Sequence, residues 1–153
     1  MNTYTVSFFG HRDFVYTKFY EEKIQKLLKQ ILSEHEYVEF LVGRNGEFDS
    51  FISSNIRTVK MEYCANNSAH VLVLPYPIAE FINNEEDFYK YYDEIEVNLK
   101  SSQSHFKGAI KIRNREMIDR SDLVIVYVEN NTGGAYEALD YSLKTGKKIV
   151  NLF

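Results

Sequence analysis

The sequence predicts an α/β protein, a Rossmann-like three-layer αβα sandwich around a mainly parallel five-stranded sheet. Short runs of β-branched and aromatic residues alternate with longer segments in which apolar residues recur every three or four positions. The short runs are continuously apolar, which is typical of parallel strands covered on both faces. The chain has 153 residues and no repeat or linker. Because that length suits one domain, we expect a single domain over residues 1–153.

Strands and helices are expected in simple alternation along the chain. The predicted strands cover residues 4–9, 37–42, 70–74, 122–128 and 148–153, and the predicted helices cover 17–36, 48–63 and 136–145. Gly146 is placed as the stop of the last helix. The segment 76–115 is less regular, acidic and rich in tyrosine. We expect it to cross the carboxyl edge of the sheet with some helix in it, as a lid or binding loop.

Composition and charge narrow the class of protein. Cys64 is the only cysteine, which excludes an internal disulfide and fits a reducing compartment, and its place on a predicted helix favours a packing role. The first residues lack a signal-peptide pattern and no apolar run could span a bilayer, so a cytoplasmic protein without a membrane partner is expected. The net charge of −4 argues against non-specific nucleic-acid binding, although a local basic pocket stays open. We therefore expect nucleic acid to be an unlikely partner.

Three glycine-bearing turns follow predicted strands and would meet at the carboxyl edge of the sheet. Glycine lets backbone approach a ligand, helix N-termini present N–H groups to an anion, and arginine suits phosphate. Each turn could also be an ordinary strand–helix connection, and Asp49 could simply be a first-turn acid of a helix. The candidate ligand-binding residues of these turns are Gly10, His11 and Arg12, then Gly43, Arg44, Gly46 and Asp49, then Thr132, Gly133, Gly134 and Ala135.

Arginine placement supports a phosphate-bearing ligand. Only six arginines are present; Arg12 and Arg44 fall on the turns, and Arg113 and Arg115 lie shortly before the fourth strand. The lysines mostly fall on predicted helix faces. His11 has no nearby partner at metal-ligand spacing, so neither a metal site nor a cofactor is expected.

The same residues carry a family resemblance. The chain resembles the SLOG superfamily, the Rossmann-like group that includes the LOG (lysine-decarboxylase-like) phosphoribohydrolases and the DNA-processing protein DprA. It is most similar to the small bacterial and phage proteins that open with a Gly-His-Arg motif. The matching pieces are FFGHRDF, VGRNGEFD, VLVLPY, RNREMIDRSDLVIVYV and TGGAYEALDYSLKTGKKIVNL, in this order along the chain.

The resemblance implies a pocket for nucleotides or NAD- and ADP-ribose-related molecules, and pairing into a homodimer or higher homo-oligomer. It places the three turns in that pocket and adds Arg113 and Asn114, which match a recurring Arg-Asn pair. The hydrolase branch fits less well, because its Pro-Gly-Gly-x-Gly-Thr-x-x-Glu motif is broken after Gly134. The position of the catalytic glutamate falls on Asp140, with Glu137 one helical turn earlier.

Three hypotheses of function follow. The leading one is a binder of a nucleotide or an NAD- or ADP-ribose-derived small molecule, acting as a sensor or sequestering protein. The alternative is an N-glycosidase of the phosphoribohydrolase kind that uses Glu137 or Asp140 as its carboxylate. The third is a DprA-like binder of single-stranded DNA, against which the acidic balance of the chain argues.

Overall fold

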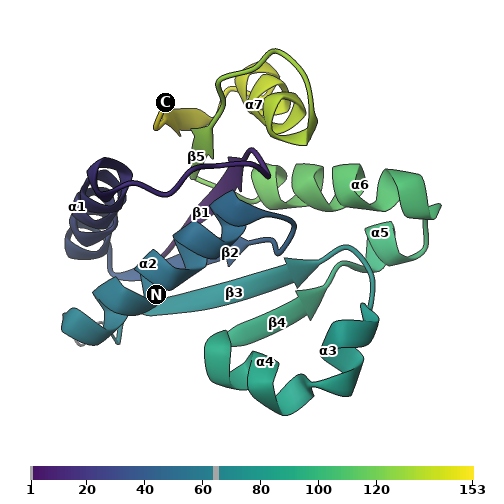
Figure 1. The fold of residues 1–153 in the computed structure, drawn as a ribbon, viewed down its shortest axis with the longest axis horizontal. Helices are drawn as coiled ribbons and strands as arrows, with labels where there is room; N and C mark the ends of the chain where they lie inside the picture. The colour runs from purple at the N-terminus through teal and green to yellow at the C-terminus, as the bar shows by residue number, and fades with distance from the viewer. Residues whose placement is uncertain (1, 64–65) are drawn as a thin grey trace.

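A six-stranded, fully parallel sheet forms the centre of the molecule (Figure 1). The computed structural model describes residues 2–63 and 66–153; Cys64, for which we predicted a packing role on a helix, lies outside them. The strand order is β4-β3-β2-β1-β5-β6. The strands are β1 (Thr3–Gly10), β2 (Tyr37–Val42), β3 (Ser68–Leu74), β4 (Glu94–Val97), β5 (Leu123–Tyr127) and β6 (Lys148–Asn151).

The predicted Rossmann-like α/β class is confirmed, but the predicted count of five strands is wrong. The missed strand, β4, has the sequence EIEV and lies at the edge of the sheet, where it pairs only with β3. Its residues are exposed or half-buried, so it lacks the continuous apolar run that marks the central strands.

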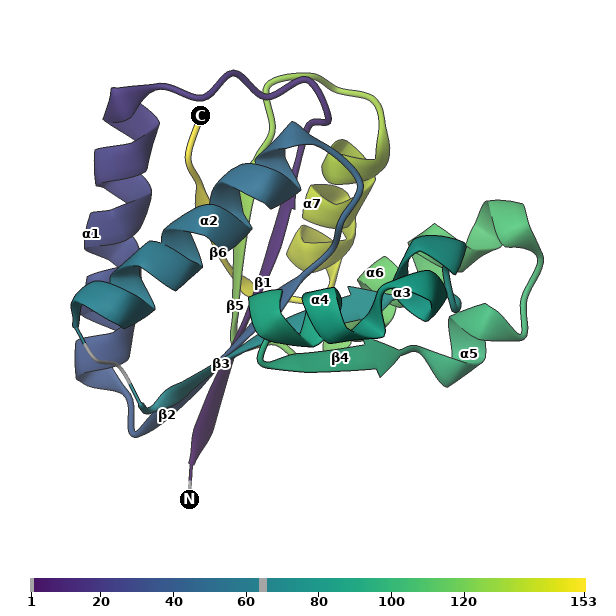
Figure 2. The ribbon, with the colours of Figure 1, turned by 60° about the horizontal axis from the view of Figure 1, so that its bottom comes forward.

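Helices cover both faces of the sheet. Figure 2 shows α1 and α2 on one side of it and α7 on the other. The core is divided accordingly: Ile24 and Phe48 pack against one face, and Met117 and Ala138 pack against the other. The helices are α1 (Lys18–Glu34), α2 (Glu47–Glu62), α3 (Ala79–Asn83), α4 (Glu85–Tyr91), α5 (Leu99–Ser102), α6 (Phe106–Asp119) and α7 (Gly134–Lys144).

Alternation along β1 separates the two halves of the core. Phe8 packs into the cluster beneath α1 and α2, and Phe9 packs into the cluster beneath α6 and α7. Ser7 is fully buried on the α6 side, where its hydroxyl lies 3.2 Å from the Met117 carbonyl and 2.5 Å from Ser121 Oγ. The polar atom is therefore satisfied, and it ties α6 to the central strand.

The irregular segment 76–115 is more ordered than we predicted. It holds α3, α4, β4, α5 and the first part of α6. The helix predicted within it is therefore present, but the interpretation of most of the segment as a loop crossing the carboxyl edge is wrong. Phe81, Phe88 and Tyr92 are buried in the core beneath α1 and α2. These aromatic residues anchor the two short helices, and the segment extends the sheet instead of covering its edge.

The strand order places a switch point between β1 and β5. From β1 the chain builds β2, β3 and β4 outward in one direction, and β5 and β6 lie in the other. In sheets of this kind ligands bind beyond the carboxyl ends of the strands at the switch point. Within the described residues, no helix has the length and apolar character needed to cross a bilayer.

Candidate functional site

A cavity of about 440 Å³ lies beyond the carboxyl ends of the central strands. Its volume falls within the range of small-molecule sites. The turns after β1, β2 and β5 all contribute to it, together with one face of α6. The lining residues are Phe8, Phe9, Gly10, His11, Arg12, Asp13, Gly43, Asn45, Gly46, Asp49, Ile110, Arg113, Asn114, Gly133, Gly134 and Ala135.

Close backbone packing joins the turn after β1 to the turn after β2. A Cβ atom at Gly46 would lie only 2.6 Å from the Cα atom of Arg12. The Glu47 N–H donates to the Arg12 carbonyl over 3.0 Å. The two turns therefore form one wall of the cavity, and a side chain at position 46 would push them apart.

His11 joins the turn after β1 to the turn after β5. Its Nε2 accepts hydrogen bonds from the N–H groups of Glu129 (2.9 Å) and Asn130 (3.3 Å). Its ring also stands edge-on to Tyr127, with 6.2 Å between the ring centroids. His11 thereby fixes the loop that leads into α7, which makes it a positioning residue of the site.

Arg113 is the buried cation of the cavity. It sits on α6, and only 3% of its surface is exposed. Its Nη1 donates to the Val73 carbonyl over 2.8 Å, and its Nε donates to Asn114 Oδ1 over 2.9 Å. Among the described residues, none accepts a hydrogen bond from Nη2 and no carboxylate forms an ion pair with Arg113. A buried guanidinium with a free donor is suited to an anionic ligand.

Asp49 is the carboxylate of the cavity whose charge interacts with that of Arg113. It accepts a hydrogen bond from the Asn45 N–H over 2.8 Å, and a Cβ at Gly43 would touch both Asp49 Oδ2 (3.1 Å) and Arg113 Nη1 (3.2 Å). Burial raises the pKa of Asp49, and the Asn45 N–H and the charge of Arg113 act in the opposite direction. Burial likewise lowers the pKa of Arg113, opposed by Asp49. Burial thus disfavours the charged form of each group, and their mutual attraction acts against this effect.

Two helices begin at the cavity without side-chain caps. Gly46 precedes α2 and Gly133 precedes α7, and neither helix has a side-chain hydrogen bond at its N-cap. Gly133 has φ +97°, a conformation that favours glycine. By contrast, Thr17 caps α1, which starts away from the cavity, by accepting from the Tyr20 N–H. The Arg12 carbonyl accepts from the Glu47 N–H, but no side chain caps the other first-turn N–H groups of α2 or those of α7, and helix starts of this kind suit an anionic ligand.

Eleven of the thirteen predicted binding residues line this cavity, and Arg44 and Thr132 do not. Arg44 turns toward the α3–α4 segment. It pairs with Glu80 (2.5 Å), donates to the Tyr92 hydroxyl (3.3 Å) and lies over the Phe88 ring. Its pKa is raised by the hydrogen bonds to Glu80 and Tyr92, although burial acts against them.

The two carboxylates of the N-glycosidase hypothesis line a different cavity. Glu137 and Asp140 face a space between α6 and α7, and Asp140 pairs there with Lys144 over 2.8 Å. The structure therefore does not bring them to the cavity that holds Arg113. Within residues 2–63 and 66–153, no cluster of three or more His, Cys, Asp or Glu side chains could hold a metal ion.

Five lining residues were not among the predicted binding residues: Phe8, Phe9, Asp13, Asn45 and Ile110. Ile110 could have been found, because it lies three and four residues before Arg113 and Asn114 and thus shares their helix face. Asp13 and Asn45 adjoin predicted residues on the same turns, and Phe8 and Phe9 are the two residues of β1 before Gly10.

The fold and the position of this cavity are those of a Rossmann-like protein. The chain is similar in structure to DNA processing protein A (DprA) from Helicobacter pylori, whose structure is described for a unique single-stranded DNA binding mode, with 17% identity and a TM-score of 0.64. It is also similar to DprA from Streptococcus pneumoniae, with 14% identity and a TM-score of 0.62. Both matches cover 95% of this chain, which spans 63% and 49% of those two proteins. Neither the protein-family models nor the curated proteins include a match.

These comparisons show a shared fold and are consistent with the SLOG resemblance; the small Gly-His-Arg subgroup stays a prediction. They also correct one expectation. The prediction that nucleic acid is an unlikely partner is wrong, because the matched fold includes a protein described as binding single-stranded DNA. The net charge of −4 is a sum over the whole surface and does not describe the charge at one cavity.

Proposed function

We propose that this chain binds single-stranded DNA by holding a nucleotide phosphate in the cavity beside Arg113. One observation carries the proposal: the Arg113 guanidinium lines the cavity, is 3% exposed, forms no ion pair and has no hydrogen-bond acceptor for Nη2 among the described residues. Burying a cation in this way is costly unless a ligand completes its pairing.

The surrounding backbone supports a phosphate at this place. The uncapped first turns of α2 and α7 both border the cavity, so their N–H groups and helix dipoles favour an anion. Arg12 adds an exposed guanidinium at the rim. The structural similarity to DprA supports single-stranded DNA as the molecule that carries the phosphate.

The second candidate is a free nucleotide, including NAD- and ADP-ribose-derived molecules, bound by a sensor or sequestering protein. The volume of the cavity, about 440 Å³, favours it, because a site of this size encloses a small ligand. In the lining the charges of Arg12 and Arg113 are balanced by Asp13 and Asp49. A long polyanion gains less from such a balanced site than from a basic stripe.

Fluorescence anisotropy with a labelled oligothymidylate tests the proposal, in competition with unlabelled AMP, NAD and ADP-ribose. We expect saturable binding that weakens with salt and is lost in Arg12→Ala, an exposed position whose substitution leaves the core intact. Thermal unfolding of the variant checks that it is folded. Binding of ADP-ribose or NAD without binding of the oligonucleotide would favour the second candidate, and no binding of either would refute both.

A further inference from the structure

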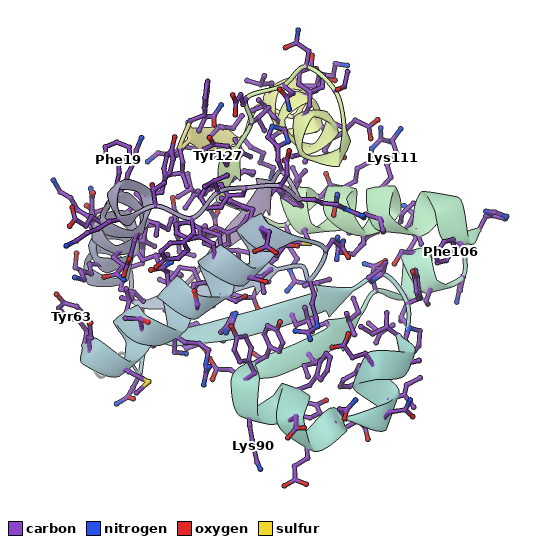
Figure 3. All side chains as sticks on the ribbon, viewed as in Figure 1. Phe19, Tyr63, Lys90, Phe106, Lys111 and Tyr127 are labelled. Carbon is purple, nitrogen blue, oxygen red and sulfur yellow. The ribbon has the colours of Figure 1, made fainter. Side chains whose placement is uncertain are left out.

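A second cavity continues the first one between α6 and α7. It has a volume of about 320 Å³, and both Asn114 and Gly134 line the two cavities. Lys111 and Arg115 lie one helical turn apart on α6, and Lys144 lies at the end of α7. Figure 3 shows Lys111 projecting from α6 on the side of α7. A ligand in the first cavity can therefore extend past Asn114 into this space.

The arginines of this chain divide by their partners. Arg44 and Arg120 form ion pairs with glutamates. Arg12, Arg57, Arg113 and Arg115 form none among the described residues. Arg57 lies over the Tyr91 ring, and the other three each line one of the two cavities. Three of the four arginines without an ion pair thus lie along the joined cavities, where phosphate groups would use their donors.

The Arg115 side chain is oriented by the Tyr141 ring. Its guanidinium lies 5.0 Å from the centroid of the Tyr141 ring, and Tyr141 is itself fixed by a hydrogen bond from its hydroxyl to Asp119 (2.6 Å). Stacking of this kind orients the planar group without using its hydrogen-bond donors. Lys111 is exposed and has no ion pair or hydrogen bond with a described residue.

Acidic groups in the second cavity only partly offset these charges. Asp140 forms an ion pair with Lys144 of the same helix, and the Glu137 side chain is exposed to solvent. The half-buried Tyr136 ring adds an aromatic surface of the kind on which bases of a single strand stack. The lining thus combines a cationic side on α6 with an aromatic residue at the start of α7.

We infer that the space between α6 and α7 binds the next nucleotide of the strand, with its phosphate on Lys111 and Arg115. This inference rests on the proposed function, since the first nucleotide occupies the cavity beside Arg113. The smallest ligand that fills the whole site is then a dinucleotide with two phosphates, and the strand passes over Asn114 and Gly134.

Isothermal titration with pdT, pdTpdT and pdTpdTpdT measures this second site. We expect the dinucleotide to bind about tenfold more tightly than the mononucleotide, with little further gain from the third unit. The slope of log K against log salt should also steepen by about 0.7 for the added phosphate. In Lys111→Ala/Arg115→Ala both gains should vanish, while the affinity for pdT stays within about twofold.

A control of equal charge is Lys26→Ala/Lys29→Ala, because these lysines lie on α1 and line neither cavity. It should keep the tenfold gain. Equal binding of pdT and pdTpdT by the unmodified protein, or a gain that survives in Lys111→Ala/Arg115→Ala, would overturn the inference and leave the first site standing. Failure of every ligand, pdT included, would instead refute the proposed function and this inference with it.

Discussion

Replacing Arg113 with methionine separates ligand binding from folding. Methionine is unbranched, flexible and uncharged, and although it is shorter than arginine it suits a position that is 3% exposed. Leaving the Val73 carbonyl without its 2.8 Å hydrogen bond costs about 1–3 kcal/mol. Removing the buried charge eliminates a desolvation penalty of several kcal/mol, part of which Asp49 offsets in the original protein. The lost hydrogen bonds and the lost attraction to Asp49 oppose the relief of this penalty, so we expect a folded variant whose free energy of unfolding changes by about 3 kcal/mol or less.

Binding should respond very differently in the same variant. A charge-assisted hydrogen bond to phosphate contributes about 1.5–3 kcal/mol, so the dissociation constant for an oligothymidylate should rise about 10- to 150-fold. Anisotropy titration and urea unfolding measure the two quantities on the same sample. Arg120→Met is the matched control, because Arg120 pairs with Glu39 and Glu96 and lines neither cavity. A folded Arg113→Met protein that binds as tightly as the original would refute the reasoning.

Three further substitutions test the supports of the site. Gly10→Ala should destabilise the protein by about 1–3 kcal/mol in urea unfolding, because the added Cβ would lie 2.2 Å from the Phe48 ring. Gly108→Ala is the control: its added Cβ meets nothing within 4 Å, so this variant should be as stable as the original or more stable. His11→Ala leaves two backbone N–H groups after β5 without their acceptor; hydrogen exchange there should accelerate and oligonucleotide affinity should fall, and unchanged exchange would contradict its positioning role. Burial lowers the pKa of His70 from 6.5 to about 4, so the unfolded chain binds a proton between these values that the folded chain does not. The contribution of neutral His70 to the free energy of unfolding is therefore complete above pH 6.5 and falls by about 3 kcal/mol as the pH drops to 4. In His70→Phe this loss should be absent from a plot of unfolding free energy against pH.

Much of the fold could be predicted because its central strands are covered on both faces. β5 is a continuous apolar run and β1 is rich in β-branched and aromatic residues, so their place in a parallel sheet is visible in the residues alone. β4 was missed because an edge strand of sequence EIEV needs only one partner and little burial. In segment 76–115 we predicted some helix but could not locate α3 and α4, because helices of five and seven residues hold few apolar residues at helical spacing.

Most of the site could be predicted from the rule that strand ends meet at one edge of a parallel sheet. The direction in which a side chain points could not be predicted from the sequence, as Arg44 illustrates. It follows β2 as expected, but its partners Glu80 and Tyr92 come 36 and 48 residues later in the chain. The sequence also could not predict that Arg113 Nη2 lacks an acceptor, because this depends on which side chains the fold brings near it.

The most direct test of the central claim is an NMR titration of the ¹⁵N-labelled protein with an oligothymidylate. We predict that the amides of Gly46, Gly134 and Ala135, at the starts of α2 and α7, shift progressively with added ligand. The amide of Asn67, beside a separate cavity that none of these residues lines, should stay unchanged. Shifts centred near Asn67, or shifts absent from the two helix starts while the oligonucleotide binds, would contradict the account.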